Sequence, residues 1–118
     1  LFTVEAERRW GPDGVHSFAV HPGAVITELA RHLTRDDVTA RLAGHQVVDV
    51  NQGAATTVWA ATSPELDGRG GLYLEDCHVA GPADDTAKGG YAPYAVDPEQ
   101  AARLWDWSER QADLHGTG

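Results

Sequence analysis

The chain has 118 residues, of which 18 are acidic and 9 are lysine or arginine, so its formal net charge is −9. Such an acidic chain repels phosphate backbones and anionic lipid surfaces, which argues against binding nucleic acids or membranes. A lone cysteine, Cys77, excludes an internal disulfide, and no apolar run approaches the roughly 20 residues of a membrane-spanning helix.

The same features predict a cytoplasmic protein that forms a single small domain. Alanine, glycine, aspartate and arginine are abundant, whereas Lys88 is the only lysine. This composition is typical of GC-rich bacterial genomes, so we expect a bacterial source.

The first ten residues predict the end of a helix. Apolar residues gather at the start of Leu1–Trp10, and Arg8 and Arg9 lie near its end, where cations meet the negative end of the helix dipole. No capping residue precedes Leu1, so we expect this helix to begin upstream of the chain. The glycines and proline of Gly11–Gly14 are expected to end it and turn the chain.

A strand and two helices are expected next. Val15–Val20 is short and mostly apolar, as in a strand that is covered on both faces. Thr34 is expected to cap a helix over Arg35–Ala43, with Asp37 at the third helical position completing a capping box. Apolar residues at helical spacing predict a longer helix over Val48–Thr62.

The remaining third predicts a strand, a loop and a helix. Leu72–Glu75 follows a glycine-rich turn and predicts a second strand, and Ala80–Ala95 predicts a loop. Asp97 followed by Pro98 and Gln100 is a strong helix start. The residues expected on the buried face of this last helix are Ala101, Leu104, Trp105, Ser108 and Ala112.

Two strands joined by helices imply a parallel pair with a right-handed crossover. Because two strands alone make a poor sheet, we interpret the chain as the final third of a doubly wound α/β domain, with two strands and about four helices present.

The segment His21–Thr27 is the main candidate for a ligand site, because ligands of open α/β sheets lie beyond the carboxyl ends of the strands. Pro22 fixes φ and turns the chain away from the sheet, and Gly23 lets the backbone approach a flat ring closely. Backbone groups from Ala24 to Ile26 could pair with an amide, and the Thr27 hydroxyl could reach a phosphate oxygen. On spacing alone, without a family in mind, a plain turn is the more frequent explanation of the Pro-Gly.

These residues also carry a resemblance. VHSFAVHPGAVITEL resembles the strand, Pro-Gly turn and Thr of the short-chain dehydrogenase/reductases, in particular the retinol-dehydrogenase-like and protochlorophyllide-reductase-like branch. LFTVEAERRW resembles the helix that follows the Tyr-x-x-x-Lys motif of that family. GAATTVWAATSPELDGRGGLYLEDC and AARLWDWSE resemble its late helix, Gly turn, last strand and C-terminal helix. The whole chain therefore looks like the C-terminal part of one Rossmann-type NAD(P)-binding domain.

The resemblance implies cofactor contacts at four positions. Pro22 and Gly23 would face the nicotinamide of NADP or NAD. The backbone at Val25 would bind its carboxamide, and Thr27 would contact the phosphate or carboxamide region of the cofactor. The implied reaction is hydride exchange between NAD(P)H and a small-molecule alcohol or carbonyl substrate.

The catalytic residues of the family are not expected within this chain. The sequence has no Tyr-x-x-x-Lys, since the residue four positions before Lys88 is Asp84, and it has no glycine-rich phosphate turn after a strand. We therefore expect the catalytic Tyr and Lys upstream of Leu1, and we expect the chain alone to be inactive. The parent protein is expected to be a homodimer or homotetramer, with Leu1, Phe2 and Val4 as interface residues.

Several alternatives remain open. A non-catalytic interaction module could reuse the fold, and a separate hydrolase could use Cys77 or Asp76. We expect Cys77 to be packed rather than reactive. His21 is expected to have a structural role at the end of its strand. The Ala80–Ala95 loop, with Tyr91, Pro93 and Tyr94, is either a cover for a substrate or a disordered connector.

Overall fold

The structure is a computed structural model that describes residues 1–25, 34, 36–37, 40 and 47–115, without the side chains of 87 and 113–115. Its α-helices are α1 (Phe2–Trp10), α3 (Val50–Thr62) and α4 (Pro98–His115). Its strands are β1 (Phe18–His21), β2 (Ala24–Val25), β3 (Val47–Val48), β4 (Leu72–Glu75) and β5 (His78–Val79). Single 3₁₀ turns occupy Gly11–Asp13, Pro64–Leu66, Thr86–Lys88 and Pro93–Val96.

The main sheet has the order β1-β4-β5. β1 and β4 are parallel, as the sequence predicts, and their register places Phe18 opposite Leu72 and His21 opposite Glu75. β5 returns antiparallel to β4, and β2 and β3 form a separate parallel pair. The chain is thus a mixed α/β structure. The expectation of two strands is wrong, because the described residues contain five strands, three of them only two residues long.

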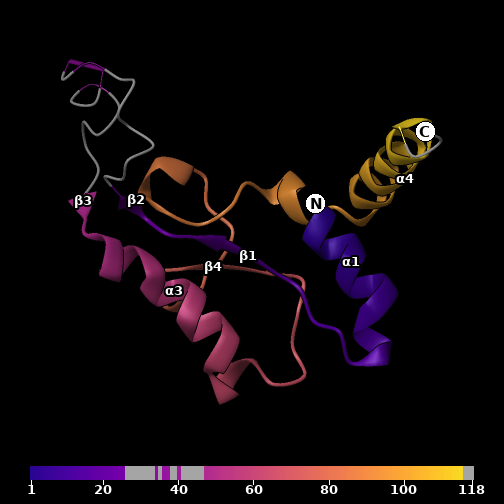
Figure 1. The fold of residues 1–118 in the computed structure, drawn as a ribbon, viewed down its shortest axis with the longest axis horizontal. Coiled ribbons are helices and arrows are strands. Elements are labelled where there is room, and N and C mark those ends of the chain that lie inside the picture. The colour runs from indigo at the N-terminus through magenta and orange to yellow at the C-terminus, as the bar shows by residue number, and fades with distance from the viewer. Residues whose placement is uncertain (26–33, 35, 38–39, 41–46, 116–118) are drawn as a thin grey trace.

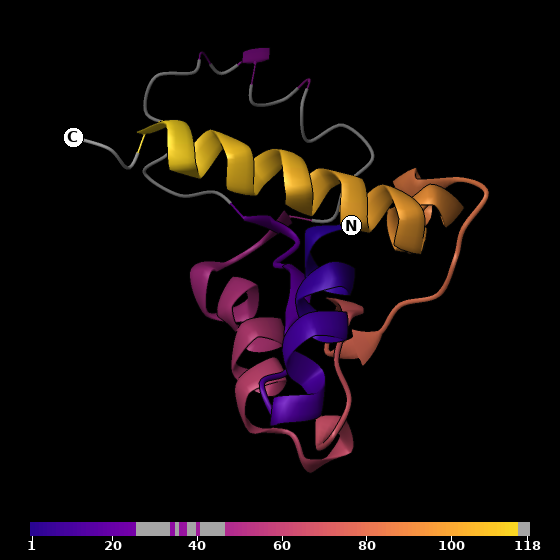
Figure 2. The same cartoon turned by 90° about the vertical axis from the view of Figure 1, so that its right-hand side faces the viewer.

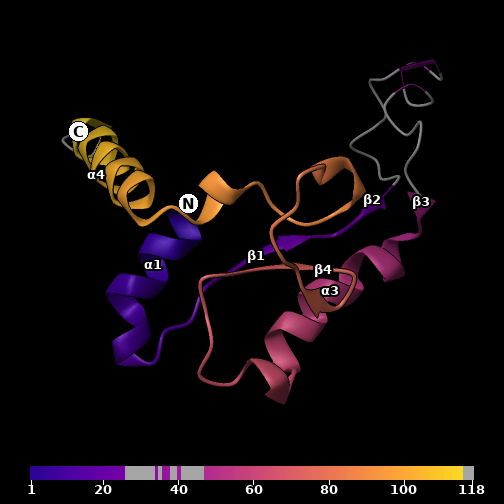
Figure 3. The same cartoon turned by 180° about the vertical axis from the view of Figure 1, so that it is seen from behind.

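Figure 1 shows β1 and β4 between α3 on one side and α1 on the other, and Figure 2 shows α4 lying across the N-terminal end of α1. Seen from behind in Figure 3, the β2–β3 pair and α4 lie at opposite ends of the molecule. At the centre of the main sheet, the side chain of Leu74 is fully buried. None of the described helices combines the length and the apolar character that crossing a membrane requires.

α3 begins two residues later than the sequence pattern suggests, because Asp49 caps it. The Asp49 carboxylate accepts from the Gln52 N–H at 2.9 Å, and the Gln52 side chain accepts from the Asp49 N–H at 2.9 Å. Such reciprocal bonds satisfy two of the amides that a helix start leaves unpaired. Gly53 lies against β2, since a Cβ on Gly53 would come within 2.5 Å of Val25 Cγ2. The cap and this contact fix α3 beside the end of β2.

The capping box expected at Thr34 is present. The Asp37 N–H donates to Thr34 Oγ1 at 3.2 Å, and the Thr34 N–H donates to Asp37 Oδ2 at 3.1 Å. Most of the helix expected over residues 35–43 lies outside the described residues.

α4 packs on α1 through Trp105, which is only 6% exposed. The Phe2 ring stacks on Trp105 with ring centroids 4.5 Å apart, and the Trp10 ring meets it edge-on at 5.1 Å. Of the face expected to be buried, Ala101 is fully buried and Leu104 and Ser108 are half-buried. The expectation for Ala112 is wrong, because this residue, one turn beyond the half-buried Ser108, is exposed.

A buried carboxylate fixes the middle of α1. Glu5 is 1% exposed and accepts hydrogen bonds from Arg8 Nε at 2.9 Å and Arg9 Nε at 2.8 Å. Hydrogen bonds from Arg8 and then Arg9 lower the pKa of Glu5 from 4.5 to about 2. The folded state therefore favours the ionised form of Glu5, because the hydrogen bonds from both arginines stabilise the negatively charged carboxylate more than the protonated carboxylic acid.

We expect Glu5 to make the stability of the protein depend on pH in the acidic range. A depressed folded-state pKa stabilises the protein above pH 4.5, and this contribution is lost as the pH falls toward 2. Calorimetry at pH 5 and pH 3 should show a smaller fall in Tm for Glu5→Gln than for the wild type. Glu99→Gln, which removes an exposed carboxylate from the first turn of α4, is the control and should keep the wild-type fall. Equal falls for all three proteins would contradict this role of Glu5.

Candidate functional site

The turn after β1 is built around Gly23. This residue has φ +86°, a conformation that side chains disfavour, and a Cβ there would lie 3.2 Å from Val48 Cγ2. The Gly23 N–H donates to Nδ1 of His21 at 3.1 Å, so His21 has the structural role expected at the strand end. Glycine is therefore needed here both for the backbone conformation and for the close approach to Val48.

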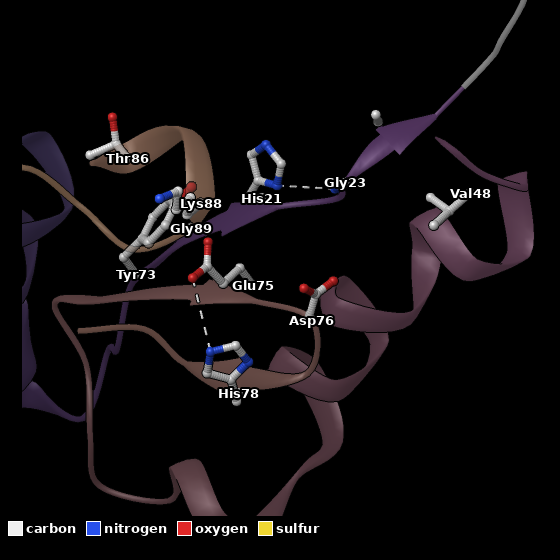
Figure 4. Close-up of a pocket in the computed structure, with 11 residues that line it drawn as sticks. His21, Gly23, Val48, Tyr73, Glu75, Asp76, His78, Thr86, Lys88 and Gly89 are labelled. Atoms are coloured by element: carbon white, nitrogen blue, oxygen red, sulfur yellow. Dashed lines mark hydrogen bonds and ion pairs between the residues drawn. The ribbon is translucent and has the colours of Figure 1, made fainter. Parts of the chain in front are cut away.

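A cavity of about 360 Å³ opens beside this turn, at the carboxyl ends of β1 and β4 (Figure 4). The two strands are parallel and pair His21 with Glu75, so their last residues reach the same edge of the sheet. This is the edge at which open α/β sheets place their ligands. The cavity is lined by His21, Gly23, Ala24, Val48, Tyr73, Glu75, Asp76, His78, Thr86, Lys88 and Gly89.

The four predicted cofactor contacts differ in where they lie. Gly23 lines the cavity, and Pro22 precedes it in the same turn. Val25 lies in β2, where it pairs with Val48 of β3, and its side chain faces Gly53 of α3. Thr27 lies outside the described residues. The roles of all four positions stay predictions.

The opposite wall of the cavity comes from the loop between β5 and α4. Thr86, Lys88 and Gly89 line it (Figure 4). The tyrosines that the sequence suggested as a cover lie elsewhere: the Tyr91 ring meets Tyr73 edge-on at 6.3 Å, and Tyr94 is 70% exposed. The loop therefore contributes to the site through residues that the sequence analysis did not select. Lys88, the only lysine of the sequence, was the available signal.

Among the described residues, the cavity is lined by three charged side chains: Glu75 at the end of β4, Asp76 directly after it, and Lys88 of the loop. Glu75 is 13% exposed; its Oε1 accepts from the Gly90 N–H at 2.7 Å and lies 3.9 Å from His78 Nε2. Burial, and then the negative charge of Glu75, raise the pKa of Tyr73 above its ordinary value. The Tyr73 phenol thus stays protonated at neutral pH, because both effects oppose a second negative charge at this edge.

Comparison with known proteins gives relatives that match nearly the whole chain. A short-chain dehydrogenase/reductase of Penicillium roqueforti is 40% identical over 118 residues, which is 95% of this chain and 35% of the relative. A probable oxidoreductase of Streptomyces lividans is 42% identical over 120 residues, covering 91% of this chain and 39% of the relative. The chain is homologous to a segment of the short-chain dehydrogenase/reductases. The family resemblance of its sequence motifs is thereby confirmed.

A WW domain-containing oxidoreductase of Danio rerio is 38% identical over 118 residues, covering 99% of this chain and 26% of the relative. The chain thus spans between 26% and 39% of the length of these three relatives. No family profile matches it, and neither does any solved structure. Because the relatives come from a fungus, a bacterium and a fish, the bacterial source stays a prediction.

The expectation of a packed Cys77 is wrong. Cys77 is exposed and has φ +55°, next to Asp76 with φ +45°, because these two residues make the tight turn from β4 into β5. Thr56 of α3 holds the turn: its Oγ1 accepts from the Cys77 N–H at 3.2 Å and lies 4.0 Å from the Cys77 Sγ. The group next to the Cys77 thiol is therefore a hydroxyl and not the imidazole that a Cys–His nucleophile requires. The relatives are named as oxidoreductases, so the alternative of a hydrolase gains no support from them either.

Proposed function

We propose that the cavity beside Gly23 is where the nicotinamide of NADP(H) or NAD(H) meets an alcohol or carbonyl substrate. The protein would then be an NAD(P)-dependent short-chain dehydrogenase/reductase, and these residues would form the C-terminal part of its Rossmann-type domain. The observation that carries the proposal is the Pro22-Gly23 turn, with Gly23 at φ +86°, at the carboxyl ends of two parallel strands. The oxidoreductase names of the relatives support it.

The residues at the cavity fit a flat polar ring. Gly23 contributes only backbone to the lining of the cavity, and an aromatic ring can approach a glycine backbone closely. Hydroxyls of Tyr73 and Thr86 and the ammonium of Lys88 supply hydrogen-bond donors around it. When bound there, a nicotinamide would supply the hydride acceptor or donor of the reaction.

In this proposal the chain binds and orients ligands, and other residues transfer the proton. Pro22, Gly23, Val25 and Thr27 would hold the cofactor, and the bond from Gly23 to His21 would keep the turn in its binding conformation. The sequence holds no Tyr-x-x-x-Lys, so we place the catalytic Tyr and Lys upstream of Leu1. The 118-residue chain by itself would then be inactive.

The test is nucleotide binding by the full-length protein, meaning the product of the complete open reading frame that contains these residues. We expect it to bind NADPH or NADH, as measured by titration of nucleotide fluorescence. Gly23→Ala should raise the Kd about tenfold or more, because the new Cβ strains the turn and crowds Val48.

Gly14→Ala is the matched control. Gly14 has φ +83°, close to that of Gly23, but a Cβ there would meet nothing within 4 Å. Both variants should lose about 1–2 kcal/mol of stability from backbone strain, whereas only Gly23→Ala should weaken nucleotide binding. A full-length protein that binds neither nucleotide would contradict the proposed function and favour an interaction module. Equal Kd increases in both variants would mean that Gly23 acts through stability alone.

A further inference from the structure

Glu75 ends β4 and connects the sheet edge to the loop that forms the far wall of the cavity. Its carboxylate is 13% exposed, and Oε1 accepts from the Gly90 N–H at 2.7 Å. His78 Nε2 lies 3.9 Å from the same oxygen, on the side away from the loop (Figure 4). A partly buried carboxylate that accepts from a backbone N–H makes a stronger hydrogen bond than a neutral pair does, so this bond attaches the loop firmly.

The loop is shaped to reach Glu75. Gly89 has φ +104° and Gly90 has φ +81°, so two successive residues adopt conformations that side chains disfavour. A Cβ on Gly89 would lie 3.0 Å from Glu75 Oε1, and a Cβ on Gly90 would lie 2.7 Å from the Gly81 carbonyl oxygen. The Gly-Gly pair therefore lets the loop backbone pass between the carboxylate and the first residues of the loop.

The base of the loop is closed by backbone bonds. The Tyr91 N–H donates to the Gly81 carbonyl at 3.1 Å, and the Ala83 N–H donates to the Tyr91 carbonyl at 2.9 Å. Between these closing bonds and the Glu75 contact lies the 3₁₀ turn Thr86–Lys88, which brings a hydroxyl and an ammonium to the cavity. The bond to Glu75 thus attaches the loop directly to β4, which forms the opposite wall, next to the edge-on contact of Tyr91 with Tyr73.

We propose that Glu75 is a positioning residue of the ligand site, which holds the Gly89–Gly90 segment so that Thr86 and Lys88 line the cavity. This inference rests on the proposed function for its ligand, but the positioning of the loop is a separate property that can be measured without one. Neither Thr86 nor Lys88 is bonded to Glu75 itself in the described contacts, so its effect on a ligand passes through the loop backbone.

The experiment uses the full-length protein with Glu75→Ala, Glu75→Gln and Glu65→Ala. Amide hydrogen exchange reports on the Gly90 N–H, and fluorescence titration gives the Kd for NADPH and NADH. We expect Glu75→Ala to speed exchange at Gly90 about tenfold or more and to raise the Kd by a similar factor. Glu75→Gln keeps an acceptor oxygen and should restore both values most of the way. Glu65→Ala removes an exposed carboxylate before β4 and should change neither.

The two measurements separate the two proposals. Unchanged exchange at Gly90 in Glu75→Ala would overturn the positioning role, as would a Glu75→Gln variant as impaired as Glu75→Ala. Faster exchange with an unchanged Kd would show that the loop has no part in ligand binding, and would also overturn the inference. A wild-type protein that binds neither nucleotide would contradict the proposed function, while the exchange data would still decide whether Glu75 positions the loop.

Discussion

Replacing Trp105 with alanine is expected to lower the free energy of unfolding by about 3–5 kcal/mol, the range typical of large aromatic residues removed from a core. Trp105 joins α4 to α1: Phe2 stacks on its ring, and Arg9 Cζ lies 4.8 Å from the ring centroid. Its Nε1–H donates to Glu109 Oε1 at 2.6 Å. The substitution therefore removes both the apolar contact and the bond that orients the ring, and α4 should detach from α1.

Trp107→Ala is the matched control for this prediction. Trp107 lies on the same helix but is 56% exposed, so its removal should change the free energy of unfolding by about 0.5 kcal/mol or less. Urea denaturation followed by circular dichroism measures both variants against the wild type. Similar losses in the two variants would show that the α1–α4 contact contributes little to stability.

Leu74→Ala should cost about 2–5 kcal/mol, because it leaves a cavity at the only fully buried large apolar side chain among the described residues. Leu74 pairs with Val79 of β5 and lies opposite Val20 of β1, so it is packed at the centre of the main sheet. Alternation along the strand places Tyr73 and Glu75 on the other face, toward the ligand cavity. Loosening β4 is therefore expected to weaken nucleotide binding as well as stability.

The control for Leu74→Ala is Val58→Ala on α3. Val58 is 58% exposed, and its substitution should stay within about 0.5 kcal/mol of the wild type. Thermal unfolding monitored by calorimetry compares the three proteins. A Leu74→Ala variant that melts with the wild type would contradict the placement of the core at β4.

The helices were predictable because their signals are local. Arg8 and Arg9 at the end of α1, and Asp97 with Pro98 at the start of α4, mark helix ends through charge and capping within a few residues. The start of α3 was missed by two residues, although Asp49 and Gln52 have the spacing of a capping box. The pattern of apolar residues at Val48 and Val50 obscured that signal.

The short strands carry no comparable signal. Two residues, as in β2, β3 and β5, are too few to show an alternating pattern, so only their pairing partners identify them. β5 depends in addition on positive φ values at Asp76 and Cys77, which are uncommon for residues other than glycine. The same turn explains why Cys77 is exposed and not packed.

The candidate site was predictable on one side only. The Pro-Gly turn directly after a predicted buried strand indicated Gly23. Ligands of open α/β sheets lie at the carboxyl ends of the strands, and the carboxyl end of a strand can be located from the sequence alone. Thr86, Lys88 and Gly89 reach the same cavity through a bond from Gly90 to Glu75, a contact between residues 15 positions apart. No local pattern encodes such a contact, so the sequence offered only the single lysine, Lys88, as a signal for this wall, and its position became visible in the folded structure.

The exposed turn that contains Cys77 gives the molecule a practical advantage for spectroscopy. The thiol is the only one in the 118-residue chain, it is exposed, and it follows Glu75 by two residues. In this 118-residue chain, a maleimide dye or a nitroxide would therefore attach at one defined position beside the cavity without any substitution. Its emission or mobility is expected to change if a ligand enters the proposed site or if the neighbouring loop is displaced.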